Sequence, residues 1–232
     1  MPLVFASALP GFADAQAGHR LRCLCARWER RAAPHLSPGQ HAHVRRFPPS
    51  GDALLARASR LLARLLAAQA LPPGARLDMD AAGRPRVSGA PGWEVAFSHS
   101  GRAAFCLVRP PQETRGETGG TAAALDAEAL SAPPPADLVF AGSARSPRAS
   151  LRRWTLAEAL FKALGARPAL WTAAAAAAHA GAGRRAGAWL WEGQRVAWRR
   201  ISCPGHVLCV ALPGAAAAPP VRLRWLAWHA FA

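Results

Sequence analysis

Lys162 is the only lysine in this chain, whose 232 residues include 29 lysines and arginines together. It lies in the stretch WTLAEALFKALG, residues 154–165, where helical spacing places it on one stripe with Trp154 and Glu158. Two interpretations are open. Glu four residues before Lys is the ordinary order of a surface ion pair. A single ammonium among so many guanidiniums also suits a position that needs a compact point charge.

A pair of carboxylates precedes this segment. Asp126 and Glu128 are separated by one residue, so on a β-strand both side chains would project from the same face. Oxygens that converge in this way suit a hard divalent cation such as Mg²⁺, held partly by a substrate phosphate. Such pairs are also common on exposed strands, where water alone surrounds them. The spacing by itself leaves both interpretations open.

Two turns carry candidates for binding an anion. His99 lies in SHS between two apolar runs, where a turn would fix the backbone and leave the side chain accessible. A structural histidine is the alternative, and no second histidine stands at metal-ligand spacing. Neighbouring Ser and His on a turn do not make a catalytic triad, and the chain has no G-x-S-x-G motif. The sequence Gly83-Arg84-Pro85 predicts a tight turn that projects a guanidinium suited to phosphate.

The composition limits the class of partner and the compartment. A net charge of +16 predicts attraction to a polyanion: nucleic acid, an acidic membrane face, a phosphorylated small molecule or an acidic protein. Five cysteines without a C-x-x-C pair give neither a disulfide framework nor a zinc ribbon, which fits a reducing cytoplasm. No segment has the apolar length that a membrane-spanning helix needs.

The apolar pattern predicts the elements that would hold these side chains. Residues 19–29 alternate and are expected to form a strand, followed by a turn-rich connection over residues 37–52. Leucines at helical spacing predict an amphipathic helix over residues 53–69. Two apolar runs around SHSG predict a hairpin over residues 93–108. Pro, Gly and charge without periodicity make residues 109–122 a loop or linker.

A second series of elements follows this linker. The carboxylate pair, a Pro-rich loop and a helix with Lys162 lead to a final pair of strands over residues 198–212, which repeats the layout of residues 93–108. The repetition indicates an internal duplication. We therefore expect an α/β (α+β) fold of two similar lobes, residues 1–111 and 112–232. Each lobe would pack a small, mainly antiparallel sheet against a long helix, with a cofactor cleft between the lobes.

The order of the motifs is more specific than any one of them: RRF at 45–47, GRP at 83–85, FSHS at 97–100, D-x-E at 126–128 and WT-x-x-E-A-x-x-K-x-x-G at 154–165. This order resembles the 4'-phosphopantetheinyl transferases, in particular the monomeric two-lobed type that activates nonribosomal peptide and polyketide synthases. The resemblance implies a pseudo-twofold pair of lobes with coenzyme A between them. It also implies transfer of the phosphopantetheine arm to a serine of an acyl or peptidyl carrier protein, with release of 3',5'-ADP.

The family's functional residues carry over by motif. Asp126 and Glu128 match the metal-binding acidic pair, and Glu158 matches the helix glutamate that completes the Mg²⁺ site and serves as base toward the incoming serine. Lys162 matches the lysine that contacts the reacting phosphate and supports the leaving group. The residues that the resemblance implies for binding coenzyme A are Arg46, Arg84, Ser98, His99 and Lys162.

The chain also departs from the family's pattern. Ala157 stands where the family usually has a lysine, and Gln40, His41 and His43 replace basic residues that help to hold the 3'-phosphate. We expect a cytoplasmic monomer whose partners are coenzyme A and an acidic carrier protein, not a membrane or nucleic acid, because no nucleic-acid-binding module is recognisable. The alternatives are a non-catalytic relative that still binds coenzyme A and a basic nucleic-acid-binding protein.

Overall fold

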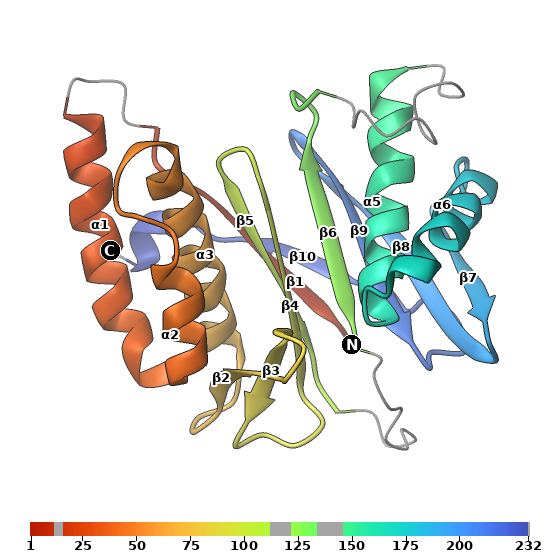
Figure 1. The fold of residues 1–232 in the computed structure, drawn as a ribbon, viewed down its shortest axis with the longest axis horizontal. Coiled ribbons are helices and arrows are strands. Elements are labelled where there is room, and N and C mark those ends of the chain that lie inside the picture. The colour runs from red at the N-terminus through yellow and green to blue at the C-terminus, as the bar shows by residue number, and fades with distance from the viewer. Residues whose placement is uncertain (12–15, 112–121, 134–145, 232) are drawn as a thin grey trace. The chain divides into compact units, whose positions relative to one another are not determined.

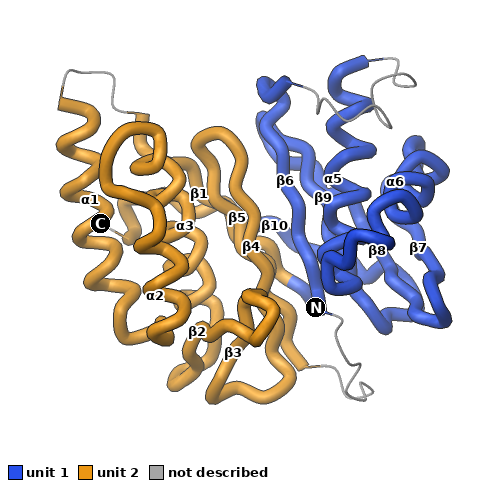
Figure 2. The backbone as a smooth tube through the Cα atoms, viewed as in Figure 1, with its two compact units in different colours: residues 1–2, 112–223 blue, residues 3–111, 224–232 orange. Residues whose placement is uncertain are grey.

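The computed structural model describes residues 1–11, 16–111, 122–133 and 146–231. The chain forms two compact units (Figure 2): unit 1 consists of residues 1–2 and 112–223, and unit 2 of residues 3–111 and 224–232. Most of the predicted linker, and most of the Pro-rich loop that was expected before the helix with Lys162, lie outside the described residues.

Unit 2 contains a four-stranded sheet in the order β10-β1-β5-β4 (Figure 1). Strand β5 is antiparallel to both β1 and β4, and all of its residues are buried. The hairpin predicted for residues 93–108 is confirmed as β4 and β5. The bounds of the four strands are β1 Leu3–Ala8, β4 Glu94–Ser100, β5 Ala103–Arg109 and β10 Arg222–Trp225.

Helices cover one face of this sheet, as Figure 1 shows. Helix α3 packs directly on β1, β4 and β5, and α1 packs on α3. The helix predicted for residues 53–69 is confirmed as α3, whose leucines enter the core of the unit. The helical segments of unit 2 are α1 Ala17–Ala32, α2 Pro38–Arg45, α3 Gly51–Ala70 and the short 3₁₀ turns η1 Ala33–His35 and η3 Trp228–Phe231.

The strand predicted for residues 19–29 is wrong, because this segment lies within α1. Leu21, Leu24, Cys25 and Trp28 are buried, and they recur with the three- and four-residue spacing of a helix. The alternation of the segment fits a strand over a short window only. Since the backbone is helical, Cys23 is exposed while Cys25 is buried, and the two thiols do not share a face.

The connection predicted for residues 37–52 also contains a helix, α2. The Ser37 hydroxyl accepts a hydrogen bond from the backbone N–H of Gln40 at 3.4 Å, and Pro38 occupies the first turn. Ser at the N-cap followed by Pro is a favourable helix start. The tight turn predicted at Gly83-Arg84-Pro85 is confirmed as part of the hairpin of β2 Arg76–Met79 and β3 Pro85–Ser88.

Unit 1 contains a four-stranded antiparallel sheet in the order β6-β9-β8-β7. Its strands are β6 Ala124–Ala129, β7 Ala186–Trp191, β8 Gln194–Cys203 and β9 His206–Pro213. Helix α5 packs on β6 and β9, and α6 packs on α5. The predicted helix with Lys162 is confirmed, and so is the final hairpin, as β8 and β9. The helical segments are α5 Pro147–Ala163, α6 Trp171–Ala180 and the 3₁₀ turn η2 Pro168–Leu170.

The mixed α and β composition confirms the expected α+β class in its coarse form. Each unit buries its own apolar core between a sheet and helices. Among the residues that the structure describes, no helix is both long and apolar enough to cross a bilayer.

Candidate functional site

The Lys162 ammonium joins two carboxylates of unit 1. Its Nζ lies 2.7 Å from Oδ1 of Asp126 and 3.0 Å from Oε2 of Glu158. The Asp126 side chain is 6% exposed and that of Glu158 is 20% exposed. The i,i+4 pair expected on the helix is therefore present, but it is not an isolated surface pair, because a buried carboxylate from a neighbouring strand completes it.

Two elements position these three side chains. Asp126 lies in the middle of β6, paired in register with Cys209 of β9. Glu158 and Lys162 are one turn apart on α5, on the side that packs against β6 and β9. The ring of Trp154, one turn earlier, makes an edge-to-face contact with Trp171 of α6, with centroids 5.2 Å apart. The strand and the helix are thus both fixed by core packing.

Burial and mutual charge determine the protonation of this cluster. Burial raises the pKa of Asp126 to about 6, although Lys162 acts in the opposite direction. For Lys162, burial favours the neutral form, but the charges of Asp126 and Glu158 outweigh it and raise the pKa. At neutral pH Asp126 is therefore ionised beside the ammonium of Lys162.

The second oxygen of Asp126, Oδ2, is buried and has no hydrogen-bond partner. A buried carboxylate oxygen without a partner is costly, and it is a donor that Mg²⁺ accepts. Glu128, two residues further along β6, is only partly buried. Within the described part of the chain, no three His, Cys, Asp or Glu side chains are gathered closely enough to hold a metal ion. The acidic oxygens thus fit Mg²⁺ in their chemistry, without forming a closed three-carboxylate site.

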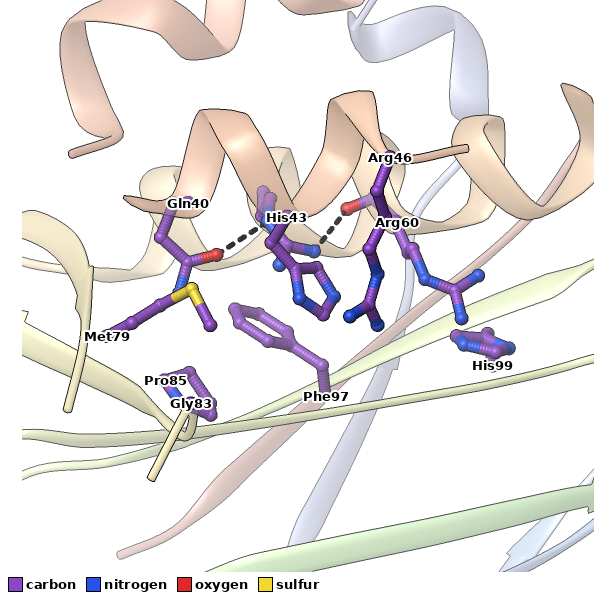
Figure 3. A pocket seen from close by; sticks show the side chains of 10 residues that line it. Gln40, His43, Arg46, Arg60, Met79, Gly83, Pro85, Phe97 and His99 are labelled. Atoms are coloured by element: carbon purple, nitrogen blue, oxygen red, sulfur yellow. Dashed lines mark hydrogen bonds between the residues drawn. The ribbon is translucent and has the colours of Figure 1, made fainter. Parts of the chain in front are cut away.

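Unit 2 contains a cavity of about 250 Å³ (Figure 3). Side chains from α2, α3, β4 and the β2–β3 hairpin meet there, and Figure 3 shows His43, Arg60 and Phe97 directed toward the same space. None of the described residues that line it is acidic. The lining residues are Gln40, His43, Arg46, Arg60, Arg64, Met79, Gly83, Pro85, Phe97 and His99.

Arg64 is the most buried cation of the cavity, at 4% exposed. Its Nε donates to Oε1 of Gln40 at 2.8 Å, and its Nη1 donates to the carbonyl of Arg60 at 3.0 Å. Both partners are neutral. Burial, with the nearby charge of Arg60, lowers the pKa of Arg64 to about 10, so the side chain is still charged at neutral pH. A buried charge without a carboxylate partner favours an anion in the adjacent space.

One aromatic ring, that of Phe47, contacts two other guanidiniums of the cavity. The Cζ atom of Arg60 lies 3.8 Å from the centroid of the Phe47 ring, and that of Arg46 lies 5.1 Å from it. Such cation–π contacts orient an arginine without neutralising it. The guanidiniums therefore keep their capacity for a phosphate, which arginine binds through two parallel hydrogen bonds.

The residues expected to bind coenzyme A lie in both units of the structure. Arg46 and His99 line the cavity. Ser98 is buried in β4 beside His99, so SHS lies in the strand and not in the turn, which begins at Gly101. Arg84 lies between two lining residues, and its Nε donates to Oδ2 of Asp80 at 2.7 Å. Lys162 belongs to unit 1.

Two arginines of the cavity, Arg60 and Arg64, are not among the binding residues predicted from the sequence. Their signal is present, since Arg64 stands between Leu61-Leu62 and Leu65-Leu66 in a helix whose leucines form the core. An arginine inside such an apolar run requires a polar environment on the buried face. Its i,i+4 neighbour Arg60 would then share that environment.

The sequence matches no protein-family model, and no curated protein matches it significantly. The assignment of a function therefore depends on the motifs, the cluster around Lys162 and the cationic cavity.

Proposed function

We propose that this protein is a Mg²⁺-dependent 4'-phosphopantetheinyl transferase, which moves the phosphopantetheine arm of coenzyme A to a serine of an acyl or peptidyl carrier protein and releases 3',5'-ADP. The observation that carries the proposal is the position of the only lysine, between Asp126 on β6 and Glu158 on α5. The motif resemblance requires these three residues to act together, although they lie up to 36 positions apart in sequence.

The proposal includes a pseudo-twofold pair of lobes that bind coenzyme A between them, as the resemblance implies. The cavity of unit 2 would take the phosphorylated nucleotide end, because it is lined by arginines and histidines and by no acidic residue that the structure describes. Arg46 and His99 are in that cavity, while Arg84 and Ser98 are adjacent to its lining residues.

Asp126, Glu128 and Glu158 would hold Mg²⁺, which would neutralise charge on the pyrophosphate when bound. Glu158 would take the proton of the attacking serine hydroxyl, directly or through a water molecule. Lys162 would place a positive charge at the phosphate that is attacked and support the departing 3',5'-ADP. A phosphoryl transfer needs such positioning and charge neutralisation. The serine O–P bond forms as the pyrophosphate P–O bond breaks.

An acidic carrier domain is the proposed partner, since a net charge of +16 favours association with an acidic surface. All five cysteines are free thiols, which supports a reducing compartment, and we propose the cytoplasm. One chain that contains both lobes would act as a monomer.

A second candidate is a relative that binds coenzyme A without transferring its arm. Two observations favour it: the absence of a three-carboxylate metal cluster among the described residues, and Ala157 in place of the family's lysine. Both candidates use the same cationic cavity, so binding alone does not separate them.

Mass spectrometry of apo carrier domains incubated with coenzyme A, Mg²⁺ and the full chain separates these candidates. We expect the mass of one phosphopantetheine to be added, and Asp126→Asn to abolish the addition while the variant still binds coenzyme A. Arg167→Ala, which breaks an exposed ion pair with Glu192 in the same unit, is the matched control and should transfer normally. Binding of coenzyme A without a mass gain on any carrier in a broad panel would favour the second candidate.

A further inference from the structure

His43 lies at the centre of the charged groups of the unit 2 cavity. It comes from α2 and is partly buried. Two arginines, Arg60 and Arg64, face it from α3, Arg46 follows it at the end of its own helix, and His99 faces it from β4. Figure 3 shows its ring between Gln40 and Arg60.

The β2–β3 hairpin contributes no acidic side chain to the lining of this cavity. It contributes Met79, Gly83 and Pro85 to the lining. Of its two carboxylates, Asp80 accepts from the guanidinium of Arg84 at 2.7 Å, and Asp78 accepts from the backbone N–H of Met79 at 2.8 Å. The groups that surround His43 are thus cationic or neutral on every side for which the structure gives lining residues.

This environment keeps the imidazole neutral in the protein without ligand. Burial and then the charges of Arg64, Arg46, Arg60 and His99 lower the pKa of His43 to about 4. A phosphate in the cavity would change the sign of this environment, because a dianion offsets the arginines and offers acceptor oxygens to the ring N–H groups. A protonated histidine then gains a strong charge-assisted hydrogen bond.

We propose that phosphate binding in this cavity is coupled to protonation of His43, so that the cavity acquires a further cation only when the anion is present. The inference rests on the proposed function, since it takes the phosphate of coenzyme A or 3',5'-ADP as the ligand. It adds a regulation of that site: affinity depends on pH through one side chain. A permanently charged lysine at this position would bind the same anion without this dependence.

The coupling has a definite size. When binding takes up one proton, the dissociation constant falls about tenfold for each unit by which the pH is lowered. This holds between the pKa of His43 in the complex and its pKa in the free protein. The phosphate monoester itself loses charge below about pH 6, which acts in the opposite direction. The ratio of wild-type affinity to that of a variant without His43 removes this contribution.

Isothermal titration of the full chain with 3',5'-ADP, in buffers of different ionisation enthalpy at pH 5.5 and 7.5, counts the protons. At pH 5.5 we expect wild type to take up about one proton more than His43→Gln does. His43→Lys should bind as tightly as wild type at pH 5.5, without that additional proton. His41→Gln changes a neighbouring histidine outside the cavity lining and should behave as wild type.

The outcomes are distinguishable. Equal proton uptake by wild type and His43→Gln, with both binding 3',5'-ADP, would overturn the coupling and leave the proposed function standing. No binding of 3',5'-ADP or coenzyme A by wild type at either pH would overturn the proposed nucleotide site and the coupling with it. His43 is only partly buried, and glutamine is a neutral replacement of similar size, so we expect His43→Gln to fold. Circular dichroism of the variant checks this.

Discussion

The Nζ atom of Lys162 lies 2.7 Å from Oδ1 of Asp126, which joins helix α5 to strand β6 across 36 residues of sequence. The other oxygen of the same carboxylate, Oδ2, is buried without a partner. One side of Asp126 is therefore neutralised by the protein itself, and the other side is available to a second cation. A purely structural ion pair does not require a second carboxylate oxygen that is buried without a partner.

Lys162→Arg should lower the rate of phosphopantetheine transfer at least about 100-fold while the protein remains folded. The guanidinium keeps the charge, but it is larger than the ammonium that fits between Asp126 and Glu158 at 2.7 and 3.0 Å. A guanidinium also does not readily give up a proton to a leaving oxygen. Initial rates on an apo carrier domain, measured with saturating coenzyme A, test this expectation.

Lys162→Met separates the catalytic role from the structural one. Removing the ammonium leaves the buried Asp126 carboxylate without its cation, and we expect a loss of about 1 to 3 kcal/mol in the free energy of unfolding, less than for a fully buried pair because Lys162 is 40% exposed. If Lys162→Arg transferred at the wild-type rate, the lysine would be a structural partner of Asp126 only.

Periodicity predicted the fold where one pattern was clear. The leucines of α3 and the paired apolar runs of β4 and β5 allow one interpretation each, and both were confirmed. In α1 the arginines fall between small or apolar residues, so a period of two and a period of 3.6 fit the same short window. Only the packing of Trp28 and its helical neighbours in the core distinguishes them.

The candidate site was predictable to different extents in the two units. Asp126, Glu158 and Lys162 were selected by motif, and the structure brings these three together. The contribution of Arg64 was not foreseen, because its environment is made by Gln40, which is 24 residues away in sequence and is itself fixed by the Asp78 carbonyl at 2.7 Å. Such a chain of hydrogen bonds has no local signature.

Arg64→Met should weaken binding of coenzyme A at least about tenfold with little change in stability. The buried guanidinium has only neutral hydrogen-bond partners. A methionine of similar length removes a buried charge that no carboxylate compensates, and this gain offsets the loss of the hydrogen bond to the buried Gln40. Titration calorimetry measures the affinity, and urea unfolding measures the stability.

Arg109→Met is the matched control for that variant. Arg109 is also buried, with a side chain 2% exposed, but its Nη1 lies 3.0 Å from Oε2 of Glu94. Breaking this ion pair should cost about 3 kcal/mol or more. If Arg64→Met destabilised the protein as strongly as Arg109→Met, the charge of Arg64 would serve the fold and not an anion.

Gly187→Ala should destabilise unit 1 by about 1 to 3 kcal/mol. A Cβ at this position of β7 would lie 2.8 Å from Cζ2 of Trp198, its cross-strand partner on β8. The indole is itself packed in the core, which limits its movement. Gly183→Ala is the control, since a Cβ there has no atom within 4 Å. Equal melting temperatures for the two variants would show that Trp198 moves without cost.

The stability of the protein without ligand should depend on pH through His43. Its pKa is lowered from 6.5 to about 4 in the folded chain. Between these pKa values the unfolded chain binds the proton and the folded chain does not. The free energy of unfolding therefore increases as the pH rises from about 4 to 6.5, and this stability is lost when the pH is lowered through the same range. Since solvent screens a partly exposed side chain, we expect a contribution of about 1 kcal/mol.

Urea unfolding of wild type and His43→Gln at pH 4.5 and 7, in buffers without phosphate, measures this contribution. The loss of stability on acidification should be smaller in His43→Gln, whereas His41→Gln should lose as much as wild type. Adding inorganic phosphate at pH 5.5 should then stabilise wild type more than His43→Gln, because the anion favours the protonated ring. An identical dependence on pH in wild type and His43→Gln would show that the surrounding arginines do not act on this imidazole.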